Sequence, residues 1–369
     1  NAHDGTIARN GDGLAYTGFE PITLTGGGAN VTVEASAFAD DITFSRIAPG
    51  KLKITSDSLT FESIEFDDPT SSLTIKSAGY VAGPAGADTI KVESLGDFAA
   101  DLTIETGSLN RMEDGEDSIT FTGNIDFKGK KLQATAENIT VNSGVTLKTS
   151  NPDGAAGAIT LASWHTIIST NAKLLAEGKD ASGSDHGDIK ISATDDSSIL
   201  TPVVNIELKD AGIDIQTGAQ IKGGDVTLTA MAAAGSMFGD DKFGLTKTET
   251  WGAGLGDAIL SKLEGLSQVV AAVTVATSEA TIDVASGATI EAKGNFEASA
   301  TAVANAKAKP TFTGAIAGKV GVPLPALAIA VGVTDATVTI GGKLDVTGKA
   351  TIKSFGDHYM DAPSDAAET

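Results

Sequence analysis

Apolar and polar residues alternate in short runs along most of the chain. Each run is three to five residues long, with an apolar residue at every second position, as in Val31-Thr-Val33, Leu73-Thr-Ile75, Leu102-Thr-Ile104 and Ile159-Thr-Leu161. Gly, Asn, Asp and Ser separate the runs. Because successive side chains of a strand point to opposite faces, each run predicts a short strand with one buried face. The frequent Thr residues suit the exposed face, where β-branched side chains are favoured.

A longer repeat underlies this alternation. The pattern apolar-x-apolar-x-x-Gly-small-x-apolar begins at Ile139, Ile213 and Ile282, and a looser copy with Asn171 in place of Gly begins at Thr166. Gly and Asn enter the left-handed backbone region most readily, so the pattern predicts a strand, a tight corner and another strand. Successive copies begin 27, 47 and 69 residues apart. We interpret these gaps as one, two and three turns of a solenoid with roughly 23 to 27 residues per turn.

These features together predict an all-β fold, a right-handed parallel β-helix. Residues 1–130 are expected to form an N-terminal β-repeat unit of the solenoid, and residues 131–369 a β-helix shaft. A β-sandwich or barrel is the alternative, but it would need longer strands and hairpin signals such as Asn-Gly between neighbouring strands. The turns here are mostly one or two residues long, and no hairpin pairing is evident from the sequence.

Two stretches interrupt the pattern and predict insertions near 231–280 and 302–335. The first is rich in Ala and Gly and then carries an apolar stripe with helical spacing, formed by Leu255, Ile259, Leu260, Leu263, Leu266 and Val270. Such a helix would pack on the solenoid or bind a partner. The second contains Pro310, Pro323 and Pro325 and then alternating small and apolar residues, which predict a further pair of strands.

Composition narrows the function. The chain of 369 residues has 48 acidic and 26 basic residues and a net charge of −22, which excludes a protein that binds nucleic acid through its backbone and argues against docking on anionic lipid. The absence of cysteine excludes disulfides, thiolate metal sites and cysteine nucleophiles. The longest apolar stretch, 314–333, contains Lys319 and two prolines, so no membrane span is expected in this fragment.

Several segments resemble the giant repeat-rich surface proteins of Gram-negative bacteria. These are β-strand-repeat or LEPR-XLL-type proteins, with filamentous-haemagglutinin-like adhesins as wider relatives. The segments that carry the resemblance are Tyr16-Thr-Gly-Phe-Glu-Pro-Ile-Thr-Leu24, Ala39-Asp-Asp-Ile-Thr-Phe44, Phe61-Glu-Ser-Ile-Glu-Phe66, Phe98-Ala-Ala-Asp-Leu-Thr-Ile104 and Ile282-Asp-Val-Ala-Ser-Gly-Ala-Thr-Ile290. The resemblance implies an exported, elongated protein of the bacterial cell surface, and it implies no particular ligand.

Five aspartates are candidate calcium ligands. Gly86-Ala-Asp88-Thr-Ile90 and Gly115-Glu-Asp117-Ser-Ile119 match the second half of the Gly-Gly-x-Gly-x-Asp-x-apolar repeat that binds Ca²⁺ in RTX proteins. The leading glycines are missing and the two copies are not adjacent. Asp40, Asp41 and Asp114 are further candidates. The alternative is that these carboxylates lie in solvated turns and cap the ends of strands.

Enzyme activity is not expected. Hydrolysis of a polysaccharide needs two facing carboxylates in a cleft, whereas the pairs Asp195-Asp196 and Asp240-Asp241 are sequence neighbours that we expect to be solvated in turns. Arginine, which would stabilise the charge of an acidic sugar, occurs only at positions 9, 46 and 111.

The sequence therefore predicts an extracellular structural and adhesive protein, the β-helical shaft of a giant surface adhesin or filament. Its partner would be a glycan or protein of a surface, with copies of the chain stacking end to end or side by side. The alternatives are a calcium-dependent carbohydrate-binding module and a β-helical polysaccharide lyase or hydrolase.

Overall fold

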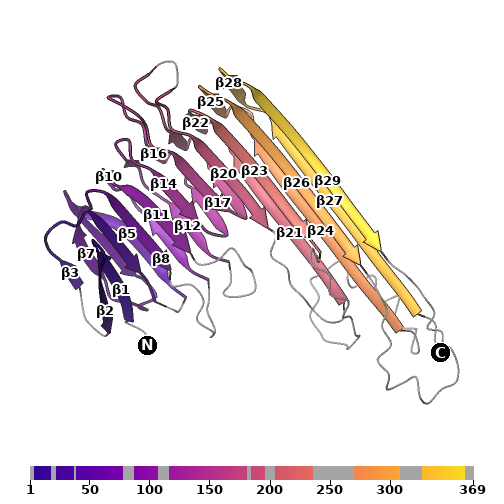
Figure 1. The fold of residues 1–369 in the computed structure, drawn as a ribbon, viewed down its shortest axis with the longest axis horizontal. Coiled ribbons are helices and arrows are strands. Elements are labelled where there is room, and N and C mark those ends of the chain that lie inside the picture. The colour runs from indigo at the N-terminus through magenta and orange to yellow at the C-terminus, as the bar shows by residue number, and fades with distance from the viewer. Residues whose placement is uncertain are drawn as a thin grey trace, which may run out of the picture.

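The computed structural model describes residues 4–17, 22–36, 39–77, 87–106, 116–180, 184–195, 204–235, 270–307 and 326–361. All regular structure in these ranges is β-strand, arranged in three sheets that run side by side along the molecule (Figure 1). The described residues contain no helix that is long and apolar enough to cross a membrane.

Two of the sheets have eleven strands and one has seven. Sheet 1 contains, in spatial order, β2 (Asp12–Thr17), β1 (Asp4–Arg9), β4 (Asn30–Glu34), β8 (Ser72–Ser77), β11 (Asp101–Thr106), β14 (Leu132–Thr135), β17 (Ile159–Ser163), β20 (Ile189–Asp195), β23 (Val226–Ala234), β26 (Phe296–Lys307) and β29 (Ala350–Asp361). Sheet 2 contains β10 (Gly96–Asp97), β13 (Ile125–Asp126), β16 (Thr146–Lys148), β19 (Lys173–Leu175), β22 (Gln220–Gly223), β25 (Thr289–Ala292) and β28 (Lys343–Val346). Sheet 3 contains β27 (Ala326–Ile340), β24 (Val270–Val284), β21 (Val204–Ile215), β18 (His165–Ile168), β15 (Asn138–Val141), β12 (Ser118–Phe121), β9 (Thr89–Val92), β5 (Asp41–Ala48), β6 (Lys51–Ser56), β7 (Ile64–Asp67) and β3 (Ile22–Leu24).

From β9 onward the chain visits sheet 3, sheet 2 and sheet 1 in turn, and every strand pairs in parallel with its equivalents in the neighbouring coils. The register places like residues on like: Ile119 of β12 lies between Ile90 and Ile139. On sheet 1 the equivalent row is Leu73, Leu102, Leu132 and Ile159. The predicted parallel β-helix is confirmed.

The inward side chains of the three sheets form a continuous hydrophobic core. A single cluster of buried apolar residues extends from Ile7 near one end to Ala302 near the other. Isoleucine, leucine and valine stack in rows along the axis, and Phe98 and Phe127 meet edge to face on consecutive coils, with their ring centroids 6.0 Å apart. Apolar burial contributes about 25 cal/mol per Å², so each coil is stabilised mainly by the row of side chains it covers.

The repeat found in the sequence lies at one corner of the coil. Gly144, Asn171, Gly218 and Gly287 all have positive φ, at 73°, 58°, 77° and 87°, and they follow aligned strands of sheet 3. The predicted left-handed corners are therefore confirmed.

The predicted number of turns between the copies was wrong. Ile139 pairs with Thr166, Thr166 with Ile213, and Ile213 with Ile282, so every gap is one turn. The later turns are longer because their strands lengthen and because residues 196–203 and 236–269, which lie outside the described ranges, fall between strands.

The N-terminal end contains hairpins that the sequence analysis did not find. β1 and β2 pair antiparallel around Asn10 and Gly11, whose φ angles are 52° and 94°. Two adjacent positive φ angles match the right-handed twist of a hairpin, and Asn-Gly is the pair that adopts them most easily. In sheet 3, β5 pairs antiparallel with β6, and β6 with β7. Antiparallel strands therefore cover this end of the parallel coil (Figure 1).

The later strands are much longer than the three to five residues expected. β24 and β27 have 15 residues each, and β26 and β29 have 12, so sheets 1 and 3 extend well beyond sheet 2 (Figure 1). Buried alanines line the far part of this two-sheet extension, namely Ala234, Ala276, Ala304 and Ala306. Small side chains let two sheets approach closely without a third sheet to fill the space.

Part of each predicted insertion belongs to the coils. Regular strands continue to residues 234 and 307 and resume at residues 270 and 326, so the ends of 231–280 and 302–335 lie in strands, and the residues between them fall outside the described ranges. The helix predicted from the apolar stripe between Leu255 and Val270 lies almost wholly outside the described residues.

The corner row predicts a graded cost of glycine replacement. Gly144→Ala should destabilise the fold by about 1 to 2 kcal/mol through left-handed strain alone, because no atom lies within 4 Å of the added Cβ. Gly218→Ala should cost more, because its Cβ would clash with the Asn171 side chain of the preceding coil. Urea denaturation followed by circular dichroism measures both. Equal costs, or no cost, would contradict the stacked corner.

Candidate functional site: a buried carboxylate ladder

Four carboxylates form one column inside the coil, which we call the carboxylate ladder. Asp40, Asp88, Asp117 and Glu137 each lie two residues before the first inward isoleucine of β5, β9, β12 and β15. Their side chains are 1%, 5%, 0% and 0% exposed. Because these strands pair in parallel register, the four residues stack in the direction of the axis at the strand spacing of about 4.8 Å.

The coils are joined by hydrogen bonds along the ladder. In each case the backbone N–H of one ladder residue donates to the carboxylate of the ladder residue in the following coil. The N–H of Asp40 donates to Oδ1 of Asp88 at 2.7 Å, and the N–H of Asp88 donates to Oδ1 of Asp117 at 2.7 Å. The N–H of Asp117 donates to Oε2 of Glu137 at 3.0 Å. The chain turns from sheet 1 into sheet 3 here, and a buried N–H without an acceptor would be costly. The ladder satisfies these groups.

The two ends of the ladder differ. At the N-terminal end, the hydroxyls of Ser36 and Thr60 donate to Oδ1 of Asp40, with Ser36 at 2.9 Å. Burial raises the pKa of Asp40 above its ordinary value of 3.8, although these hydrogen bonds act in the opposite direction. At the other end, the backbone N–H of Trp164 donates to the Glu137 carbonyl at 2.8 Å, and the fully buried Trp164 ends the row of carboxylates.

The structure brings together three of the five calcium candidates, but not as turn ligands. All three are buried, so the expectation that they are solvated is wrong. Asp88 and Asp117 accept backbone N–H groups next to the start of a strand, and Asp40 accepts the hydroxyls of Ser36 and Thr60. Asp41 is exposed at the start of β5, and Asp114 lies outside the described residues. Among the residues described, no group of three or more His, Asp or Glu is arranged to hold a metal ion.

Glu137 was missed by the sequence analysis although a signal existed. It precedes Ile139 by two residues, as Asp117 precedes Ile119 and Asp88 precedes Ile90. Aligning the chain on these isoleucines would have placed all the carboxylates in one column.

A second group of buried charges lies further along the coil. Lys209 of β21 is 3.4 Å from Oδ1 of Asp195 and 3.7 Å from Oε1 of Glu207, measured from Nζ, and all three side chains are almost completely buried. The expectation that Asp195 is a solvated turn residue was wrong, because it is the last inward residue of β20. Burial raises the pKa of Glu207, partly offset by the N–H of Gly235 and the charge of Lys209.

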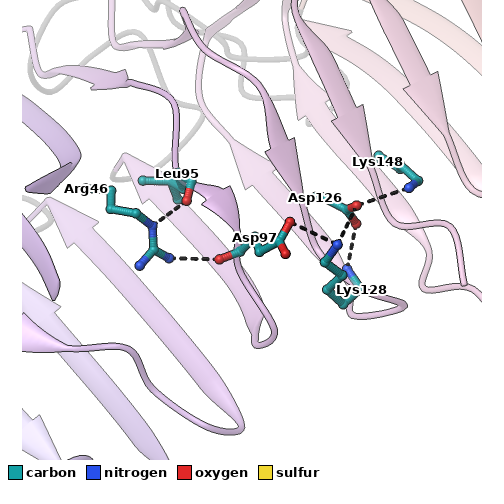
Figure 2. A network of polar contacts seen from close by, with 6 residues as sticks. All are labelled: Arg46, Leu95, Asp97, Asp126, Lys128 and Lys148. Atoms are coloured by element: carbon teal, nitrogen blue, oxygen red, sulfur yellow. Dashed lines mark hydrogen bonds and ion pairs between the residues drawn. The ribbon is translucent and has the colours of Figure 1, made fainter. Parts of the chain in front are cut away.

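A third network closes the first edge of sheet 2 (Figure 2). The Arg46 guanidinium donates to the backbone carbonyls of Leu95 and Asp97, on either side of Gly96 in the edge strand β10. Lys128 joins the carboxylates of Asp97 and Asp126 at 2.9 Å each, and Lys148 reaches Asp126 from the next coil at 3.0 Å. Covering an edge strand in this way blocks pairing with another chain.

The ion pairs of this network shift the pKa values of Asp126 and Lys128. Burial by itself would raise the pKa of Asp126, but hydrogen bonds from Lys128 and Lys148 outweigh burial and hold the pKa below its ordinary value. Hydrogen bonds to Asp97 and Asp126 raise the pKa of Lys128. Asp126 and Lys128 are therefore both ionised at neutral pH, and their ion pair stabilises the outer face of sheet 2.

Comparison with models of protein families, with curated proteins and with solved structures finds no match for this chain.

The ladder predicts that removing the Asp40 charge stabilises the protein at neutral pH. A raised pKa means that the folded chain binds the proton more tightly, so the contribution of Asp40 to stability is complete below pH 3.8 and is lost as the pH rises through the raised value. Asp40→Asn keeps an acceptor for Ser36 and Thr60. It should therefore raise the urea midpoint at pH 7 and change it little near pH 3.

The control is Asp41→Asn at the exposed neighbour, which should leave the midpoint unchanged at both pH values. A loss of stability in Asp40→Asn at pH 7 would show that the ionised carboxylate is favourable inside the coil.

Proposed function

We propose that the protein is an extracellular structural shaft that presents an adhesive surface on the bacterial cell. The observation that carries this proposal is the uninterrupted stack of coils, each of which pairs only with the coils directly before and after it. In such a solenoid, stability is close to a sum of neighbour contacts, so reach can be gained by adding coils without redesigning a core. The resemblance to giant surface adhesins agrees with this use.

The outer face of sheet 1 suits adhesion to an extended polymer. One outward row places Thr32, Thr74 and Thr103 on consecutive strands, and Thr160, Thr227 and Thr351 recur in the same row further along. The hydroxyls of the first three threonines are spaced at about the 4.8 Å distance between strands. Further along the row, Gln133, Lys190 and Glu297 alternate with the threonines and add other hydrogen-bonding groups. A row of donors and acceptors on a rigid face matches the repeating hydroxyls of a surface glycan, which is the ligand class we propose.

Charge also supports a location outside the cell. A net charge of −22 generates self-repulsion that ions of the medium screen. On the outer faces, lysines of one coil pair with glutamates of the neighbouring coil and neutralise part of the negative charge. Lys76 and Glu105 lie 3.2 Å apart, and Lys353 and Glu297 lie 3.1 Å apart. Exposed pairs of this kind contribute little each, roughly 0 to 1 kcal/mol.

Adhesion through sheet 1 predicts a difference between two matched variants. Thr74→Glu with Thr103→Glu adds charge to the threonine row, whereas Thr120→Glu with Thr140→Glu makes the same change on the outer face of sheet 3. The first double variant should lose at least tenfold in the retention of protein-coated beads on glycan arrays, and the second should behave as the parent. Binding by neither the parent nor the variants, or an equal loss in both variants, would overturn the proposal.

The same assay separates the alternatives. A calcium-dependent carbohydrate-binding module would release the glycan when a chelator is added, whereas retention by the threonine row is unchanged. A polysaccharide lyase or hydrolase would shorten the bound glycan over time, which size-exclusion chromatography of the sugar detects.

The last described coil supports association of two copies. β27, β28 and β29 pair on one side only within the described residues, and the inward residues Leu344 and Val346 are only partly buried. Ile352 is 50% exposed although it lies in an inward row. The opposite end is covered by antiparallel strands, so the two ends are not equivalent. We propose that a second copy of this coil covers the first, end against like end, giving pairs rather than long fibres.

This arrangement predicts a concentration-dependent dimer. Sedimentation of the chain should show a shift from monomer to dimer as concentration rises, and Ile352→Lys should prevent it by placing a charge in the contact. Thr351→Lys, on the outer face one residue away, should still dimerise. A parent that stays monomeric at the highest concentration, or fibres that grow without limit in electron micrographs, would contradict the proposed pairing.

A further inference from the structure

The buried group of Asp195, Glu207 and Lys209 lies where the two-sheet extension begins. Asp195 ends β20 in sheet 1, and the other two residues point inward from β21 in sheet 3. The lysine side chain therefore reaches across the interior from one sheet to a carboxylate on the other, with Nζ 3.4 Å from Oδ1 of Asp195.

Packing does not require charges at this place. In the next coil the positions aligned with Glu207, Lys209 and Asp195 are Ala276, Ser278 and Ala232, and all three are fully buried. The extension thus closes with small residues one coil later. Burying a lysine and two carboxylates is costly even when they are paired, because the loss of hydration can exceed the attraction between them. This cost points to a chemical role.

We propose that Lys209 and Asp195 condense to form an amide cross-link between sheets 3 and 1, with Glu207 transferring the proton. The inference is independent of the proposed adhesive function, because it rests only on these three side chains and their surroundings.

The reaction needs no partner beyond the three side chains. One proton passes from the Lys209 ammonium to the Asp195 carboxylate, which leaves a neutral amine and a neutral carboxylic acid. Nζ then forms a bond to Cγ of Asp195, one carboxyl oxygen leaves as water, and the surplus proton on nitrogen moves through Glu207 to that leaving oxygen. In total, an ammonium and a carboxylate become one amide and one water, with no change in oxidation state.

The geometry brings the two reacting groups into contact. Nζ of Lys209 lies 3.4 Å from Oδ1 of Asp195, the oxygen bonded to the Cγ atom that Nζ would attack. Holding the two groups together inside the protein removes most of the entropy of encounter. The backbone N–H of Asp210 donates to Oδ2 of Asp195 at 3.1 Å, which orients the carboxyl group and stabilises negative charge on that oxygen during attack.

Glu207 is placed to move the proton and not to react. It lies two residues from Lys209 on the same strand, and its Oε2 is held by the N–H of Gly235 at 2.6 Å. Its Oε1 is 3.7 Å from Nζ. Because burial raises the pKa of Glu207, this carboxyl can exchange a proton closer to neutrality than an exposed glutamate.

The exposed ion pairs of the same chain provide an internal comparison. Lys353 and Glu297 lie 3.1 Å apart, closer than Lys209 and Asp195, but their side chains are 61% and 46% exposed. Water solvates such exposed groups and competes with the amine for the carboxyl carbon. The cross-link is therefore expected only at the buried group.

Mass spectrometry tests the proposal on the parent chain. The intact protein should be one water lighter than its sequence. Trypsin should fail to cleave after Lys209 and should release residues 191–222 as a single peptide that is also one water lighter. An uncross-linked chain would release 191–209 and 210–222 separately. Cyclisation of an aspartate also removes water, but it leaves Lys209 open to cleavage.

Recovery of both short peptides at full mass from folded protein would overturn the proposal, whatever the variants show. The Lys209→Met variant has no amine at this position, so its intact mass should equal the mass calculated from its own sequence. Glu207→Gln keeps both reacting groups and should slow cross-linking by about a hundredfold or more when samples are taken during cell-free synthesis.

Glu297→Gln, which removes the partner of the exposed Lys353, should cross-link at the parent rate. If Glu207→Gln also reacts at the parent rate, Glu207 does not transfer the proton and that part of the proposal is wrong.

Discussion

The parallel, in-register pairing of equivalent strands is the constraint on which the rest of this structure depends. Once Ile119 is paired with Ile90 on one side and Ile139 on the other, every neighbouring residue is also placed opposite its equivalent. Apolar residues then cover apolar residues, corners cover corners, and carboxylates cover carboxylates. A shift of one residue would turn all inward side chains outward, so the register is set by the hydrophobic rows themselves.

Stacking like on like creates a difficulty wherever a row is polar, and the structure solves it with hydrogen bonds between coils. At the turn from sheet 1 to sheet 3, Asp88 and Asp117 each accept the backbone N–H of the coil before them. At another corner, the side chain of Asp225 accepts the N–H of Asn295, and the side chain of Asn295 accepts the N–H of Lys349. Each row satisfies the backbone groups that the turns leave without strand partners. The buried carboxylates are thus part of how the coil turns. The hydrogen bonds they accept from backbone N–H groups offset the free-energy cost of burying a charged side chain.

The change from a three-sheet coil to a two-sheet extension follows from side-chain size. Near the N-terminus the rows are built from phenylalanine, isoleucine and leucine, which need three walls to enclose them. Toward the C-terminus, β26 carries alanine at 298, 300, 302, 304 and 306, all fully buried, and two sheets are enough. The group of Asp195, Glu207 and Lys209 lies at this transition, where the first coil of the extension leaves the support of the shorter coil before it.

The residue pattern alone was sufficient for the strand class, the inward faces and the left-handed corners, because alternation and glycine conformation are local properties. Gly144, Gly218, Gly287 and even Asn171 were placed correctly for this reason. The count of turns, the burial of Asp88 and Asp117, and the meeting of Lys209 with Asp195 were decided only by the tertiary structure. They depend on which coil lies against which, and that pairing is set by strand lengths and insertions over tens of residues, which a local pattern does not contain.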